Sequence, residues 1–338
     1  MQRFPYALLL LAGLHAGMAC ATEDSAAGRP SKPNIVLILT DDLGWQDVHC
    51  YDIDEPSPME TPNIDRLASQ GVMFWQAYSP APVCAPSRAA ILSGLHPARG
   101  GMTSVAGGFP PRPRTQHAPQ ISPFYLARMP MERFTLAEAL KQSGYRTGHC
   151  GKWHISKNHY DYPKPYHHGF DSSVHNRGVQ VPMKPDRLTG FATSNPEDPY
   201  RLDENGFPFD TPQQAALDFL QTNKEEPFFL YYATWLVHAP IVMRSEALLR
   251  KYEAKLGVTL KPEHATTWKI PGQTNPFYCA MVEQLDYYVG QVIEYLESND
   301  DPRWPGHKLI ENTYIVFTSD NGGMEGGGNE IYMRTNTS

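Results

Sequence analysis

Several classes of protein are excluded by what this sequence has little of. Five cysteines among 338 residues, without dense spacing, do not make the framework of a small disulfide-stabilised domain. Acidic side chains outnumber basic ones by 36 to 29, and this argues against a nucleic-acid-binding protein. Beyond the amino terminus, no apolar run is long enough to span a bilayer. The remaining possibility is a globular chain, 41% hydrophobic, with enough residues to bury a sizeable core.

The first 21 residues have the features of a secretory signal peptide. Arg3 precedes an apolar run, and Ala19-Cys20-Ala21 is a small-residue cleavage site. We therefore expect a linker over residues 22–31 and an exported protein, secreted or periplasmic, with no transmembrane segment after removal of the signal. Lipid attachment at Cys20 is the less favoured alternative, because the residues just before it include no good apolar one.

Aliphatic runs alternate with helix signals along the rest of the chain. Residues 33–40, P-N-I-V-L-I-L-T, are typical of a parallel strand that is covered on both faces. Further strands are expected at residues 145–150, 227–234 and 313–319. Helices are expected at about residues 62–70, 84–93, 136–143, 211–220 and 275–298. Long loops are expected at residues 99–130 and 155–210. The alternation predicts an α/β fold with a largely parallel central sheet flanked by helices, in one domain over residues 32–338.

Local signals mark the starts of two of these helices. Thr135 and Glu138 form a capping box. Thr211, Pro212 and Gln214 are expected to cap the helix that follows residue 210.

Polar side chains follow all four predicted strands. In chain order they are Asp41 and Asp42, Lys152 and His154, His238, and Asp320 with Asn321. Each alone has an ordinary explanation, because aspartates and Asp-Asn-Gly-Gly sequences form turns and a lone histidine is more often structural. Because the carboxyl ends of parallel strands meet at one edge of a sheet, where ligands bind, we expect these side chains to lie together.

The residue types at this edge indicate two kinds of ligand. Oxygen atoms of Asp41, Asp42, Asp320 and Asn321 would suit Ca²⁺ or Mg²⁺ and would not suit zinc. The cations and hydrogen-bond donors around them are the groups that an anionic, oxygen-rich group needs, and they are Arg88, Lys152, His154 and His238.

Cys84 begins the sequence C-A-P-S-R and a short apolar helix pattern that runs to Gly94. The start of a helix favours developing negative charge, so Cys84 is a candidate for chemistry. The alternative is a small buried residue that only packs. The cysteines at positions 50, 150 and 279 lie outside any such pattern and are expected to pack.

C-A-P-S-R, followed by L-S-G at residues 92–94, resembles the signature of the formylglycine-dependent (type I) sulfatases of the alkaline phosphatase superfamily. The other landmarks of that family occur in its order. They are D-D-L-G-W at 41–45, E-T-P-N-I-D-R-L-A at 60–68, G-K-W-H at 151–154, H-A-P at 238–240 and D-N-G-G at 320–323. The resemblance runs from about Lys32 to Gly323 and implies an alkaline phosphatase-like fold.

The resemblance implies a modified residue and a bound metal ion. A formylglycine-generating or radical maturation enzyme would oxidise Cys84 to formylglycine (3-oxoalanine), whose hydrate supplies the nucleophilic oxygen. A divalent cation, Ca²⁺ with Mg²⁺ as the alternative, would be held by residue 84 and four others. These four are Asp41, Asp42, Asp320 and Asn321.

The same resemblance implies roles for the surrounding side chains. Arg88 would orient the formylglycine, Lys152 and His238 would hold sulfate oxygens, and His154 would hydrogen-bond the hydrate. Protonation of the leaving alcohol is assigned to His238 or Lys152, and the sequence does not separate them.

The sequence departs from the family pattern at its carboxyl end. Family members carry a further active-site lysine and a smaller carboxyl-terminal subdomain after the D-N-G-G turn, whereas residues 324–338 contain no lysine. We therefore expect a chain truncated at its carboxyl end, with an incomplete catalytic domain and the subdomain missing.

The expected function is a sulfuric ester hydrolase acting on an exported sulfated small molecule or glycan, most simply a carbohydrate sulfate. Aromatic and basic residues at 109–117 and 160–177 support a carbohydrate, although the same residues also fit ordinary surface loops. Two alternatives are a phosphonate or phosphodiester hydrolase of the same superfamily and an inactive, truncated binder of sulfated glycans.

Overall fold

The computed structural model describes residues 28–51, 56–113, 120–267, 269–270 and 275–323. The expected signal peptide, Cys20, most of the linker and residues 324–338 lie outside the described residues.

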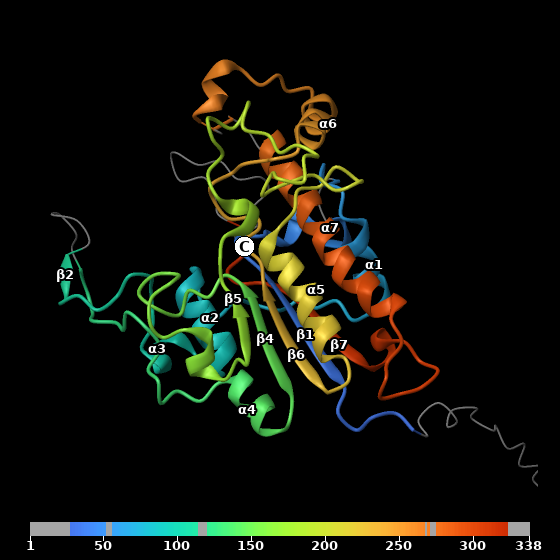
Figure 1. Ribbon diagram of the computed structural model, residues 1–338. Coiled ribbons are helices and arrows are strands. Elements are labelled where there is room, and N and C mark those ends of the chain that lie inside the picture. Colours follow the sequence, from blue (N-terminus) through green and yellow to red (C-terminus); the bar gives the residue numbers. More distant parts are fainter. Residues whose placement is uncertain (1–27, 52–55, 114–119, 268, 271–274, 324–338) are drawn as a thin grey trace, which may run out of the picture.

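A five-stranded parallel sheet forms the centre of the molecule (Figure 1). The strands are β1 (Asn34–Thr40), β4 (Arg146–Gly151), β5 (Ser172–Val174), β6 (Phe228–Ala233) and β7 (Thr313–Ser319). Their order across the sheet is β5-β4-β6-β1-β7, and every neighbouring pair is parallel. The predicted α/β class with a largely parallel sheet is confirmed.

Helices cover both faces of the sheet. In Figure 1, α2, α3 and α4 lie on one side, whereas α1, α5 and α7 lie on the other. The helices are α1 (Pro62–Gln70), α2 (Cys84–Ser93), α3 (Pro97–Gly100), α4 (Leu136–Gln142), α5 (Thr211–Asn223), α6 (Glu246–Leu256) and α7 (Pro276–Ser298). α6 packs against α7. None of the helices in the described part of the chain is long and apolar enough to cross a membrane.

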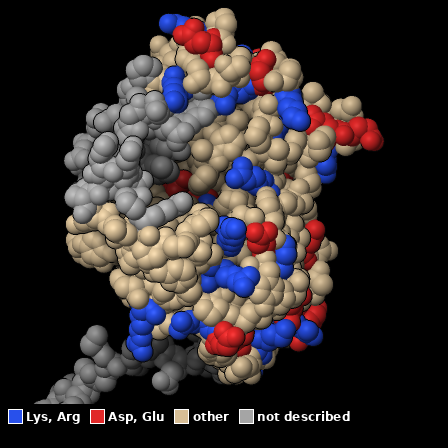
Figure 2. Space-filling view, turned by 90° about the vertical axis from the view of Figure 1, so that its left-hand side faces the viewer, with Lys and Arg blue, Asp and Glu red and all other residues tan. Residues whose placement is uncertain are grey.

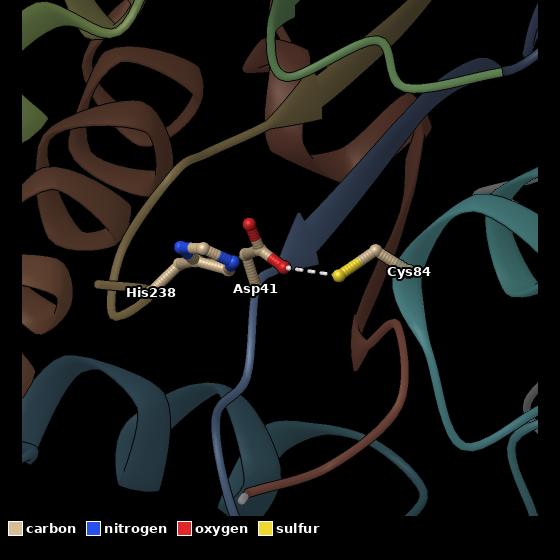
Figure 3. Close-up of side chains that lie close together, drawn as sticks. All are labelled: Asp41, Cys84 and His238. Carbon is tan, nitrogen blue, oxygen red and sulfur yellow. Dashed lines mark hydrogen bonds between the residues drawn. The ribbon is translucent and has the colours of Figure 1, made fainter. Parts of the chain in front are cut away.

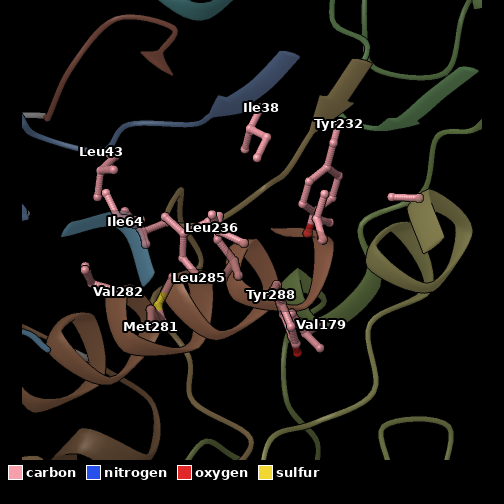
Figure 4. Close-up of a cluster of buried hydrophobic side chains, with 14 of the residues drawn as sticks. Ile38, Leu43, Ile64, Val179, Tyr232, Leu236, Met281, Val282, Leu285 and Tyr288 are labelled. Carbon is pink, nitrogen blue, oxygen red and sulfur yellow. The ribbon is translucent and has the colours of Figure 1, made fainter. Parts of the chain in front are cut away.

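The two faces of β1 explain why its sequence is apolar without alternation. Val36 and Ile38 belong to the larger hydrophobic cluster, with residues of α5, α6 and α7 (Figure 4). Leu37 and Leu39 belong to a second cluster, with residues of α2 and α4. A strand buried on both faces loses the period-2 pattern and keeps only a continuous aliphatic run.

The two predicted long loops contain short elements that the sequence did not indicate. β5 lies within residues 155–210 and adds the fifth strand. α3 begins before residue 99, and β2 (Arg112–Pro113) pairs antiparallel with β3 (Ile121–Ser122). Six 3₁₀ turns complete the described elements: η1 (Trp45–Asp47), η2 (His49–Tyr51), η3 (Pro165–His168), η4 (Gly178–Gln180), η5 (Pro262–Ala265) and η6 (Leu309–Asn312).

The capping predictions had different outcomes. Thr135 and Glu138 form the capping box at α4, with Thr135 Oγ1 accepting from Glu138 N. At α5 the prediction was wrong by one position, because Asp210 is the N-cap and accepts a hydrogen bond from the backbone N–H of Gln213. Aspartate is among the strongest N-cap residues, so the helix begins one residue after it.

Candidate active site

Four strand ends meet at one edge of the sheet through backbone hydrogen bonds that continue past the strands. Asp41 N donates to Leu236 O at 3.0 Å, and Val237 N donates back to Asp41 O at 2.7 Å. Asp320 N donates to Thr40 O, and Lys152 N donates to Ala233 O. The segments that carry the predicted polar side chains are therefore held beside one another by the sheet itself.

Asp41 and Asp42 reach the same centre although they are consecutive. Successive side chains of a strand point to opposite faces. Asp42 has a φ of +61°, a left-handed conformation that ends the extended backbone after β1. Both carboxylates are consequently buried at the edge of the sheet.

Cys84 is the first residue of α2 and lies next to Asp41. Its thiol donates to Asp41 Oδ1 at 3.4 Å. Figure 3 shows this pair with His238, which approaches from the loop after β6. The Nε2 atom of His238 lies 3.6 Å from Asp42 Oδ2.

Arg88 lies one helical turn after Cys84, so both side chains share a face of α2. Its Nε donates to Asp320 Oδ2 at 2.8 Å, and its Nη1 donates to the carbonyl oxygen of Lys152 at 2.8 Å. Lys152 forms a buried ion pair with Asp41 and is 0% exposed. Two buried cations therefore lie among three buried carboxylates.

The carboxylates are in an electrostatically crowded environment. Burial, and then repulsion from Asp41, raises the pKa of Asp320 to about 7, and the same two causes raise the pKa of Asp42. For Asp41 burial acts in the same direction, but Lys152, His238 and Arg88 outweigh it and hold its pKa well below the usual range. Further positive charge would be favourable at this centre.

The residues present fit a hard divalent cation. Ligand atoms of Asp41, Asp42, Cys84 and Asp320 all lie within 4.8 Å of one another. Among the described residues, Asp42 Oδ2 and Asn321 Oδ1 are buried and have no hydrogen-bond partner. Asn321 joins the group because its Nδ2 donates to Asp42 Oδ1 at 2.7 Å. Clustered carboxylate and amide oxygens are the ligand set that Ca²⁺ and Mg²⁺ prefer.

The Cys84 thiol is not an activated nucleophile in this environment. Burial, and then the charge of Asp41, raises its pKa far above the usual value, so the thiolate is disfavoured. The unmodified thiolate of Cys84 is therefore not the expected reacting group.

His154 lies at the same edge beside a residue that the sequence analysis missed. Its ring centroid is 4.0 Å from that of His159, and its Nδ1 is buried without a hydrogen-bond partner in the described structure. Burial, and then the charge of Lys152, lowers the pKa of His154 to about 2, so the ring is neutral and can accept a hydrogen bond, but it is a weak base. His159 lies in a loop with no regular spacing, and no sequence signal marked it.

Other contacts around the centre also escaped the sequence analysis. The hydroxyls of Ser79 and Ser87 both donate to the carbonyl oxygen of Asp320, which fixes the start of the D-N-G-G turn against α2. Ser87 lies within C-A-P-S-R, so the motif contained a signal for it. Gln180 of η4 donates to the carbonyl oxygen of His238 at 2.6 Å.

Comparisons with known proteins identify sulfatases as relatives of this chain. N-acetylgalactosamine-6-sulfatase from Rattus norvegicus is 32% identical over 329 residues, which cover 91% of this chain and 54% of the relative. N-acetylgalactosamine-6-O-sulfatase from Bacteroides thetaiotaomicron is 28% identical and covers 86% of this chain and 59% of the relative. The chain thus spans little more than half the length of these curated relatives.

Solved structures share the fold. The crystal structure of Ps i-CgsB superposes with a TM-score of 0.60 at 28% identity, covering 89% of this chain and 61% of the other. Its complex with k-i-k-neocarrahexaose gives a TM-score of 0.58 at the same identity and coverage. The sequence profile of the Sulfatase family matches residues 33–337, a range that includes every residue gathered at the sheet edge. The chain belongs to the sulfatase family.

Proposed function

We propose that the protein is a sulfuric ester hydrolase that removes sulfate from a carbohydrate sulfate ester, with Cys84 converted to formylglycine and a divalent cation bound beside it. The observation that carries the proposal is the position of residue 84. Its Sγ lies within 4.8 Å of ligand atoms of Asp41, Asp42 and Asp320. A modified side chain at this position would be presented to the cation and to any anion bound there.

The cation, Ca²⁺ or Mg²⁺, would be held by residue 84 and by the oxygen atoms of Asp41, Asp42, Asp320 and Asn321. When bound, such an ion lowers the pKa of a hydroxyl group and neutralises the charge of a sulfate oxygen. The hydrated formylglycine would supply the hydroxyl that attacks sulfur.

The buried side chains of Arg88 and Lys152 would position residue 84, its acidic neighbours and the sulfate group. Arg88 is fixed by Asp320 and by the Lys152 carbonyl, so its role is to orient residue 84 and its acidic neighbours. Burial opposes the charged form of Lys152, but Asp41 and other neighbouring acidic groups outweigh it and raise the pKa. Lys152 therefore stays protonated and is suited to binding a sulfate oxygen.

The geometry favours His238 over Lys152 as the proton donor to the leaving alcohol. The side chain of His238 is 27% exposed, so the alcohol can reach it from the open side of the site. Lys152 is fully buried against Asp41 and holds its proton tightly. The neutral ring of His154 is available to accept a hydrogen bond from the hydrate.

The relatives and the sequence support a substrate class and a cellular location. Two relatives are named as N-acetylgalactosamine 6-sulfatases, and this supports a sulfated amino sugar. The expected signal peptide supports export, and a maturation enzyme is the required partner for residue 84.

The proposal is tested by sulfate release from a panel of sulfated sugars after co-expression with a maturation enzyme. We expect Cys84→Ala to abolish release, and Cys150→Ala, which changes a buried cysteine of β4 outside the cluster, to retain it per folded molecule. Mass spectrometry of the peptide containing residue 84 should show formylglycine. Release that is unaffected by Cys84→Ala would refute the mechanism.

The same assays separate the two alternatives. Turnover of phosphoesters far above that of sulfate esters would favour the phosphonate or phosphodiester hydrolase. Glycan binding with an unmodified Cys84 and no turnover would favour the inactive binder.

A further inference from the structure

A cationic side chain without an acidic partner lies next to the candidate active site. The guanidinium carbon of Arg177 lies 4.5 Å from the centre of the Trp235 ring, and Lys152 Nζ lies 5.1 Å from the same centre. The distance between the Arg177 guanidinium carbon and Lys152 Nζ is therefore at most the sum of these two distances. No carboxylate in the described part of the chain forms an ion pair with Arg177.

Polar atoms on the same wall have no hydrogen-bond partner within the described part of the chain. Trp235 is 2% exposed, yet its indole N–H has no hydrogen-bond partner among the described residues. The ring of His159 lies 4.6 Å from that of Trp235, and its Nδ1 is also buried without a partner in the described structure. Buried polar groups normally have partners, so a wall with several unpaired ones is a candidate for ligand contact.

The turn that carries Arg177 is fixed in place before any ligand arrives. Val179 N donates to Asp210 Oδ1 at 2.8 Å, and Gln180 Nε2 donates to the carbonyl oxygen of His238. Gly178 has a φ of +49°, and a Cβ at this position would lie 1.8 Å from Asp210 Oδ1. Only glycine allows this close approach, so η4 presents Arg177 in a preorganised position.

Charged side chains are visible in a hollow on one face of the molecule (Figure 2). Figure 2 shows a hollow in which acidic and basic side chains are visible, with further Lys and Arg side chains close to it. Arg177 itself is partly exposed, so a ligand can reach its guanidinium group. An arginine that is stacked on an aromatic ring keeps its N–H fork free for carboxylate or sulfate oxygens.

We propose that Arg177 is a specificity-determining residue that binds a second negative charge of the substrate, either a carboxylate on the adjoining sugar or a further sulfate, beside the ester held at residue 84. This inference rests on the proposed sulfatase function and narrows its substrate to polyanionic glycans. A single ester on an otherwise neutral sugar would leave Arg177 without a partner.

The test compares one neutral-backbone probe with two anionic ones. The first probe is N-acetylgalactosamine 6-sulfate. The others are the disaccharide in which a uronic acid is linked to that sugar and the 4,6-disulfated monosaccharide. We expect wild type to have a higher kcat/KM for at least one anionic probe. Arg177→Gln should lower kcat/KM about 10- to 100-fold more for that probe than for the first, the range typical of a hydrogen bond to a charged group.

Two control variants accompany the test. Arg177→Lys keeps the charge and should restore part of the preference. Arg29→Gln removes another arginine that lies over a tryptophan, Trp304 at 5.8 Å, at the opposite end of the sheet, and should leave the preference unchanged. Equal losses on all probes in Arg177→Gln, or no preference in wild type, would overturn the inference.

Dissociation constants of the three probes measured on Cys84→Ala, with and without Arg177→Gln, give a readout that does not depend on turnover. A preference that disappears with Arg177 supports the inference, and one that persists overturns it. If the matured wild type releases sulfate from no sugar of the panel, the proposed function fails, and the binding comparison still decides the role of Arg177.

Discussion

At the scale of single residues, Arg88 connects three buried groups of the candidate site. It bonds to Asp320 and to the Lys152 carbonyl, and its Nη2 lies 3.8 Å from Asp41 Oδ1. We expect Arg88→Gln to lower the free energy of unfolding by about 3–5 kcal/mol, because it leaves buried carboxylates without their cation. Urea denaturation measures this change.

Arg146→Gln is the matched control for that variant. Arg146 pairs with Glu226 at 2.9 Å, but both side chains are half exposed. Exposed ion pairs contribute about 0–1 kcal/mol, so this variant should unfold close to wild type. Comparable losses in the two variants would mean that the buried network at Arg88 is not the source of its stability.

Residue types and strand ends predicted the carboxylates of the site. Asp41, Asp42 and Asp320 were expected together because they follow the ends of two parallel strands, β1 and β7, and the structure places them together. Trp235 and Arg177 were not expected as a pair, because their contact depends on how two loops fold. Loop sequences have no periodic pattern of apolar residues from which such contacts can be predicted.

At the scale of elements, α1 and α7 meet at a site where little space is available. Asp286 of α7 accepts hydrogen bonds from the backbone N–H groups of Asn63 and Ile64 in the first turn of α1. A Cβ on Gly290, one turn later in α7, would lie 2.5 Å from Asn63 Cγ. We expect Gly290→Ala to displace the Asn63 amide, which donates to Asp286 Oδ2 at 2.8 Å, and to destabilise the protein by about 1–3 kcal/mol.

The check is a chemical denaturation curve of Gly290→Ala against that of Gly100→Ala. A Cβ on Gly100 would meet nothing within 4 Å, so that variant should lie within about 1 kcal/mol of wild type. If Gly290→Ala is as stable as wild type, α1 and α7 can adjust at no cost and the close contact is not required.

The accuracy of the sequence prediction differed between elements for a physical reason. β7 was predicted to its end residues, and α1 and α7 to within one, because their ends carry capping or turn residues next to a strong apolar pattern. β5 was missed because it has three residues and pairs on one side only. Pairing with β4 stabilises this strand, and its three residues are too few to show a periodic pattern of apolar side chains.

At the scale of the whole molecule, composition and local charge point in different directions. The net charge is −7, which argues against nucleic acid as a ligand. Yet Arg88, Lys152 and Arg177 gather at one end of the sheet around the candidate site. Binding of an anion depends on the local field, so an acidic protein can still select a polyanionic substrate.

The carboxylate cluster links metal binding to the stability of the entire fold. Without a cation, the pKa of Asp320 is about 7, against an ordinary value of 3.8. Between these two values the folded protein holds a proton that the unfolded chain does not. The contribution of Asp320 to the free energy of unfolding of the cation-free protein should therefore fall as the pH rises from about 4 to about 7.

Binding of Ca²⁺ should offset this pH-dependent decrease in the free energy of unfolding. At pH 8 the carboxylates are ionised and bind the cation without releasing a proton, whereas at pH 5 the cation must displace one. Thermal unfolding should therefore show a larger rise in Tm on addition of Ca²⁺ at pH 8 than at pH 5, with about 2.7 kcal/mol of stabilisation at a hundredfold excess over Kd. Asp320→Asn should remove most of the effect, whereas Asp300→Asn, at an exposed side chain, should retain it. A calcium response that is equal at both pH values, or equal in the two variants, would show that the cation binds elsewhere, because only a site built on Asp320 exchanges that carboxyl proton for the metal.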